Sequence, residues 1–117
     1  MPEPSSDRAP TFESYQRDAS RTLNASLTPA DQSLDAAAGL AEEAGEILAL
    51  IRKDRFQGRA LDREQLIAEL GDALWCLTAV TTAMGLSLGD VAAANLAKLR
   101  ARYPHGLGRT SSKDPAG

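Results

Sequence analysis

Five acidic residues lie in two short clusters, and none of them has a basic residue at helical spacing. The clusters consist of Glu42, Glu43 and Glu46, and of Glu69 and Asp72. A surface helix commonly pairs an acid with Lys or Arg three or four positions away, because such residues are neighbours on the helix. Here those positions hold only small, apolar, amide or acidic residues. Because like charges at this spacing repel, the pattern predicts two helices that gather carboxylates around a hard divalent cation.

The composition favours a single small all-α domain. The chain has 117 residues, of which 43% are hydrophobic and only 4% aromatic. Packed helices tolerate such an Ala- and Leu-rich mixture, whereas β-sandwiches usually need more β-branched and aromatic residues. The net charge is -3 and the isoelectric point is about 5.1. This acidic balance gives no reason to expect nucleic-acid binding.

Cysteine usage and the N-terminal residues suggest a cytoplasmic protein without a membrane partner. Cys76 is the single cysteine, so no internal disulfide can form. No hydrophobic run is expected to reach transmembrane length, and the N-terminus lacks the basic-then-apolar pattern of a signal peptide. A reducing compartment is therefore the expectation.

Start and stop signals divide the chain into four helices. N-cap residues are expected at Thr11, Thr28, Asp62 and Ser87. The expected helices run from about 12 to 24 or 26, 29 to 53, 62 to 84 and 88 to 103. Short connections between four helices predict an antiparallel four-helix bundle. Residues 1–10 are expected to be a disordered leader, 11–104 the folded domain and 105–117 a flexible tail.

Periodicity on the third helix predicts its buried face. The expected inward stripe consists of Ile67, Leu70, Leu74, Leu77 and Val80. A bundle of this length buries little apolar area by itself, so we expect the protein to self-associate.

The spacing of the acids suits one shared cation. Residues three or four positions apart share a helical face, as do Glu43 and Glu46, and Glu69 and Asp72. If the second and third helices are antiparallel neighbours, both pairs face one cavity suited to Mg²⁺ or Mn²⁺. With one histidine and one cysteine in the chain, a zinc site with nitrogen and sulfur ligands is excluded.

Three glycines accompany the acids, at Gly39, Gly45 and Gly71. Each costs roughly 1 kcal/mol inside a helix relative to alanine. Their retention suggests that another backbone, or a ligand, approaches the helices closely at these positions.

The predicted cation site points to phosphoryl or nucleotidyl chemistry, because carboxylate-bound Mg²⁺ with open positions usually meets substrate phosphates. Two other classes remain open. One is a non-catalytic module that binds nucleotide or metal. The other is a helical interaction module whose acids are only a solvated surface. The missing Lys–Glu pairing around the five acids counts against the second.

These motifs resemble a known family. Glu42-Glu43-x-x-Glu46 is followed after 22 residues by Glu69-x-x-Asp72, and later by Asn95-x-x-Lys98 and Arg102-Tyr103-Pro104. This arrangement is similar to the signature of the MazG-like, all-α nucleoside triphosphate pyrophosphohydrolases, over roughly residues 30–104.

The resemblance implies Mg²⁺-dependent hydrolysis of a nucleoside triphosphate to the monophosphate and pyrophosphate, with Mn²⁺ as a possible substitute. It also implies a homodimer or homotetramer. Glu43, Glu46, Glu69 and Asp72 would be the metal ligands. Glu42 would bind a further metal or orient the attacking water, so that all five acids would be catalytic.

The resemblance also implies substrate contacts outside the acids. Asn95 and Lys98 would reach the phosphates or the sugar, and Trp75 and Cys76 would line the base pocket. Each has a plainer interpretation. Lys98 suits a solvated helix face, Trp75 suits a core or dimer interface, and Cys76 suits a small buried hydrophobe.

Overall fold

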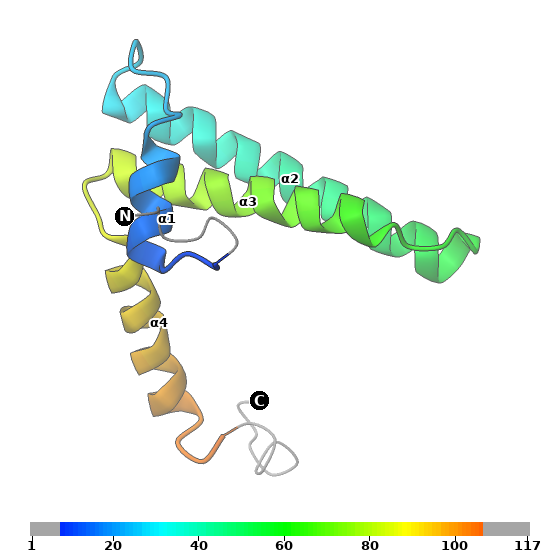
Figure 1. Ribbon diagram of the computed structural model, residues 1–117. Helices are drawn as coiled ribbons and strands as arrows, with labels where there is room; N and C mark the ends of the chain where they lie inside the picture. Colours follow the sequence, from blue (N-terminus) through cyan, green and yellow to red (C-terminus); the bar gives the residue numbers. More distant parts are fainter. Residues whose placement is uncertain (1–7, 107–117) are drawn as a thin grey trace.

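The computed structural model describes residues 8–106, and this part of the chain consists of four α-helices without strands (Figure 1). The predicted all-α class is confirmed. Residues 1–7 of the predicted leader and 107–117 of the predicted tail lie outside the described residues. The helices are α1 (Phe12–Ser20), α2 (Pro29–Gln57), α3 (Arg63–Ala83) and α4 (Leu88–Arg102).

Each helix begins at its predicted N-cap. The side chains of Thr11, Thr28, Asp62 and Ser87 each accept a hydrogen bond from the backbone N–H three residues later, at 3.0 to 3.2 Å. These bonds satisfy one of the N–H groups that a helix leaves unpaired at its start. Local sequence chemistry therefore determines where all four helices begin.

Two helix ends differ from the expectation. α1 ends at Ser20 rather than near residues 24–26. Beyond it, Thr22 donates its hydroxyl to the carbonyl oxygen of Ala19, and Asn24 accepts the backbone N–H of Ser26, so side chains replace the helical pattern. α2 extends past residue 53 and ends before Gly58, whose φ of 67° is left-handed.

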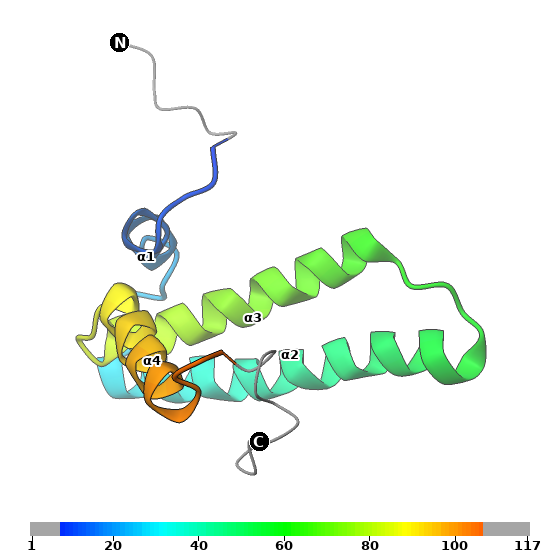
Figure 2. The same ribbon diagram turned by 90° about the horizontal axis from the view of Figure 1, so that it is seen from below.

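The antiparallel hairpin of α2 and α3 forms the centre of the molecule, and both views show its two arms side by side (Figures 1 and 2). Small side chains line the contact, where Ala36, Cys76 and Ala79 are buried. A Cβ atom on Gly39 would lie only 2.9 Å from the Sγ of Cys76. Gly39 therefore leaves room for the Cys76 thiol, whereas a Cβ atom on Gly45 or Gly71 would meet no described atom within 4 Å, so the protein itself makes a tight contact at only one of these three glycines.

Gln16 of α1 fixes the direction in which the chain leaves α3. Its Nε2 donates to Thr82 Oγ1 and to the carbonyl oxygen of Leu86, each at 3.0 Å. Its Oε1 accepts the backbone N–H of Leu88 at 2.8 Å, at the first residue of α4. α4 then points away from the hairpin (Figure 1). Within the described residues it contacts α1 and α3 but not α2.

The four helices form a more extended structure than a compact domain of this length. The Cα radius of gyration is 17.7 Å, compared with about 13 Å for a compact domain of similar length. The stripe predicted to be buried on α3 is largely exposed, with Ile67, Leu70 and Leu74 at 66%, 49% and 37%. The expectation that this stripe is buried is therefore wrong for a single chain. The small residues of α3 make the contact with α2, and the larger apolar residues remain exposed to solvent.

By length and composition alone, α3 is apolar enough to cross a membrane, which corrects the expectation that no segment reaches that threshold. Core helices of soluble proteins pass the same test. Glu69 and Asp72 lie within α3, and carboxylates inside hydrocarbon are costly.

Candidate metal centre

Three carboxylates converge between the arms of the hairpin. Glu43 of α2 and Glu69 and Asp72 of α3 each offer an oxygen, and these oxygens lie within 4.8 Å of one another. The two acidic clusters, far apart in the sequence, thus meet in space. This is the arrangement that the shared-cavity interpretation requires.

The helical register explains the convergence. On α2, Glu43 follows Ala36 and Gly39 at i+7 and i+4, so it continues the stripe that faces α3. On α3, Asp72 precedes the buried Cys76 by one turn. Because Glu43 and Asp72 continue the faces on which Gly39 meets Cys76, their carboxylates come together.

One oxygen of Glu43 is suited to bind a cation. Its Oε1 is buried and has no hydrogen-bond partner among the described residues. Leaving a carboxylate oxygen buried and unsatisfied is unfavourable unless a positive group approaches it. The ion pairs of the described chain join Arg17 and Arg21 to Asp18, and none involves the cluster. An all-oxygen donor set with an orphaned anionic atom fits a hard divalent cation.

The repulsion within the cluster appears in two raised pKa values. The pKa of Glu46 is raised mainly by a hydrogen bond with the Glu69 carboxyl, then by the negative charge of Glu69. The pKa of Glu69 is raised mainly by a hydrogen bond with Glu43 and by partial desolvation. Since two carboxylates can share a hydrogen bond only when one is protonated, the cluster holds protons more tightly than isolated acids do. A bound cation would replace those protons.

Glu46 and Glu42 flank the three convergent acids. Glu46 is exposed but close enough to Glu69 to shift its pKa. Glu42 is exposed as well, and its charge contributes in a minor way to the raised pKa of Cys76. Three of the predicted acids thus converge, Glu46 affects the pKa of Glu69, and Glu42 lies next to Glu43 on the exposed side.

Tyr15 of α1 is a neighbour of the cluster that the sequence did not single out. It is half-buried, and its pKa is raised mainly by burial and then by the negative charges of Asp72 and Cys76. Little in the sequence indicates a role for Tyr15 at the site, because a tyrosine on the apolar face of a helix usually only packs against the core. Tyr15 is therefore close enough to Asp72 for the negative charge of that carboxylate to affect its hydroxyl.

Trp75 and Cys76 both make contacts that stabilise the fold. The Nε1 of Trp75 donates to the Thr22 hydroxyl at 2.6 Å. Cys76 is buried against Gly39, and burial is the main reason that its thiol pKa is raised. A thiol with a raised pKa is a poor nucleophile, so the buried-hydrophobe interpretation describes Cys76 well.

Asn95 and Lys98 are exposed on α4, away from the cluster. Asp72 lies about 16 Å from the end of α3, and Lys98 lies about 15 Å beyond the start of α4, from the rise per residue. Because α4 points away from the hairpin (Figures 1 and 2), one chain does not bring these residues to the carboxylates.

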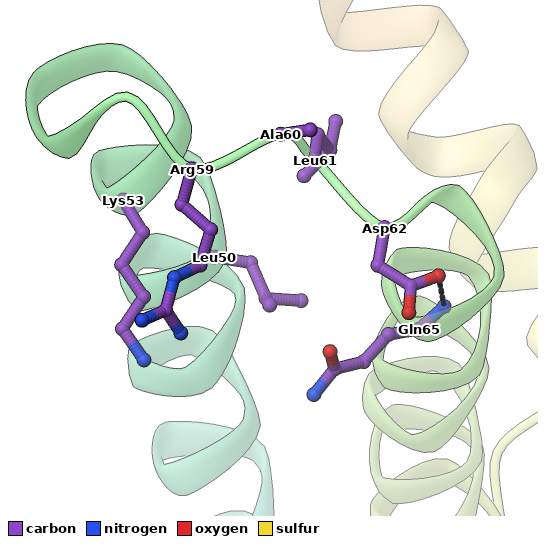
Figure 3. A pocket seen from close by; sticks show the side chains of 7 residues that line it. All are labelled: Leu50, Lys53, Arg59, Ala60, Leu61, Asp62 and Gln65. Atoms are coloured by element: carbon purple, nitrogen blue, oxygen red, sulfur yellow. Dashed lines mark hydrogen bonds between the residues drawn. The ribbon is translucent and has the colours of Figure 1, made fainter.

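A separate hollow of about 330 Å³ lies at the far end of the hairpin (Figure 3). Its one carboxylate, Asp62, is engaged in capping α3 through the backbone N–H of Gln65 at 3.1 Å. The hollow is therefore distinct from the acidic cluster.

Residues 32–107 match the family described as MazG nucleotide pyrophosphohydrolase domain. Searches of curated proteins and of solved structures gave no significant match. The matched segment contains both acidic clusters and the α2–α3 hairpin that joins them. The chain therefore belongs to the MazG nucleotide pyrophosphohydrolase family.

Proposed function

We propose that this protein hydrolyses a nucleoside triphosphate to the monophosphate and pyrophosphate, in a reaction that depends on Mg²⁺. The observation that carries the proposal is the convergence of Glu43, Glu69 and Asp72, with one oxygen of Glu43 buried and unpaired. Membership of a pyrophosphohydrolase family supports the reaction class. Oxygen ligands alone favour Mg²⁺, with Mn²⁺ as a substitute.

In this proposal, Glu43, Glu46, Glu69 and Asp72 hold the cation. A cation bound there supplies charge neutralisation for phosphate oxygens and lowers the pKa of water. Glu42, exposed at the margin, is placed to orient the attacking water or to hold a further cation. Tyr15 belongs to α1, and its raised pKa reflects burial and the nearby charge of Asp72.

The proposed site is completed by a second copy of the chain. α4 carries Asn95 and Lys98, and its only acid, Asp90, lies in the first turn. No basic side chain of α4 forms an ion pair in the described structure. A basic helix without partners and an acidic hairpin without partners are complementary. We therefore place Asn95 and Lys98 of one copy over the carboxylates of the other, in a symmetric homodimer or a tetramer built from it.

Exposed apolar residues supply the remaining driving force for this assembly. Leu70, Leu74 and Leu77 on α3 and Leu96 and Leu99 on α4 are all at least one-third exposed. Fully burying one leucine contributes roughly 2 kcal/mol. Covering even part of these surfaces would stabilise the pair of chains considerably.

The direct test is a panel of nucleoside triphosphates with Mg²⁺ or Mn²⁺, in which monophosphate and pyrophosphate are measured separately. We expect equal amounts of the two products, and no inorganic phosphate. Glu46→Gln and Asp72→Asn should each lower the rate by roughly 100-fold while the helical circular-dichroism signal remains. Nucleotide binding without product would instead indicate a non-catalytic binding module. Full activity in both variants would refute the proposed site.

A further inference from the structure

The hollow at the end of the hairpin lies on the same helical faces as the carboxylates. On α2, Leu50 and Lys53 follow Glu46 at one and two turns and line the hollow. On α3, Gln65 precedes Glu69 by one turn and lines the opposite side. Since residues at these spacings share a face, one surface runs continuously from the acidic cluster to the hollow.

Three polar side chains that have no partner among the described residues line this hollow. Lys53 and Arg59 have no ion pair or side-chain hydrogen bond in the described part of the protein, and neither does the side-chain amide of Gln65. Figure 3 shows Lys53 and Arg59 on one side, with Gln65 across from them. Asp62 is occupied by its capping bond. The hollow therefore offers several free hydrogen-bond donors and an excess of positive charge.

Apolar side chains share the lining with these donors. Leu50, Ala60 and Leu61 face the same hollow. Its volume of about 330 Å³ is at the lower end of the range of small-molecule sites, and apolar walls beside a few convergent polar groups suit one small ring. A site for phosphate alone would have little use for apolar walls. A flat heteroaromatic ring with carbonyl groups on its edge uses both.

We infer that this hollow binds the base of the nucleotide whose phosphates are held at the carboxylates, an inference that rests on the proposed function. Lys53 lies seven residues beyond Glu46, or about 10 Å along the helix, which is within the length of one nucleoside triphosphate. Leu50 and Leu61 contact the ring faces. Lys53, Arg59 and Gln65 donate hydrogen bonds to its edge, so these residues determine which base is preferred.

The test compares kcat/KM for triphosphates that share one sugar and differ only in the base. Lys53→Gln and Gln65→Leu should each change the ratio between the preferred and the least preferred base by at least about 10-fold. The Mg²⁺ concentration that gives half-maximal rate should stay the same, because neither residue belongs to the carboxylate cluster. Arg55→Gln is the matched control: it removes the same charge from an exposed position on the other side of α2, and the ratio should not change.

A uniform loss of kcat/KM for all bases would assign these residues to phosphate binding and overturn the inference, as would an unchanged ratio. Titration with nucleoside monophosphates without Mg²⁺ separates this inference from the proposed function. Base-dependent binding that Lys53→Gln and Gln65→Leu weaken, in a protein that hydrolyses no triphosphate, would refute the proposed reaction and retain the base pocket. Hydrolysis with base-independent binding would retain the reaction and refute the pocket.

Discussion

The indole Nε1 of Trp75 donates a hydrogen bond of 2.6 Å to the hydroxyl oxygen of Thr22. The Thr22 hydroxyl in turn donates a hydrogen bond of 2.7 Å to the carbonyl oxygen of Ala19, at the end of α1. These two hydrogen bonds connect α3 to a segment that lies 53 residues earlier in the sequence. The polar edge of Trp75 is therefore engaged by the fold, and only the faces of its ring remain available to a ligand.

Removing either partner of this bond should loosen the attachment of α1. We expect Trp75→Phe and Thr22→Val each to lower the free energy of unfolding by about 1 kcal/mol, the usual net worth of one such bond. The double variant should lose less than the sum, because both changes remove the same interaction. Urea unfolding followed by circular dichroism measures all three. Strict additivity would show that the bond contributes nothing.

The contact between Gly39 and Cys76 makes a second prediction. Gly39→Ala should destabilise the protein by about 1 to 3 kcal/mol, because the new methyl group overpacks the buried thiol, despite the better helix propensity of alanine. Cys76→Ala removes the sulfur, so adding it to Gly39→Ala should recover most of the loss. Denaturant midpoints test this pair. No recovery in the double variant would mean that backbone, and not the thiol, limits the approach of the helices.

The raised pKa values of Glu46 and Glu69 predict how stability depends on pH in EDTA. Between the ordinary carboxyl pKa of 4.5 and the raised values, the folded protein binds more protons than the unfolded chain. The stability of the metal-free protein should therefore fall as the pH rises through this window, and stay lower at neutral pH. In Glu46→Gln/Glu69→Gln this fall should shrink.

Thermal melts at several pH values, with and without Mg²⁺, measure the effect. Mg²⁺ should raise the Tm of the wild type at neutral pH, because it binds the folded state. The double variant should show little response. An equal response to Mg²⁺ in both proteins would locate the cation elsewhere.

A mixed assembly tests whether α4 acts on the neighbouring chain. One copy carries Glu46→Gln/Asp72→Asn, and the other carries Asn95→Ala/Lys98→Ala. If the site combines both chains, a dimer purified through two different tags has one intact site of two, and about half of the wild-type activity. If each site belongs to one chain, the mixed dimer should be as inactive as either parent. Failure of the two tagged copies to purify together would also refute the shared site.

The sequence predicted those parts of the fold that depend on local chemistry. Thr28 and Asp62 marked helix starts because a capping side chain needs only its own helix, and Gly39 marked a tight contact with a side chain of α3. The meeting of Glu43 with Glu69 was also foreseeable, since both lie on the inward faces of an antiparallel hairpin.

The features that the sequence did not predict depend on contacts between distant segments. The exposure of Leu70 was missed because a stripe of large apolar residues looks the same whether its own chain or a second chain covers it. Tyr15 was missed because only the crossing of α1 over α3 brings it near Asp72. The hollow lined by Lys53 was missed because a connection without regular pattern forms its wall.

The amide of Gln16 separates the orientation of α4 from the geometry of the carboxylates. A single side chain, bonded to the end of α3, the turn and the start of α4, orients the whole fourth helix. Altering that one residue should change the angle between α4 and the hairpin while leaving every carboxylate in place. In the dimer that we propose, the geometry of the encounter would then depend on one amide and the chemistry on other residues.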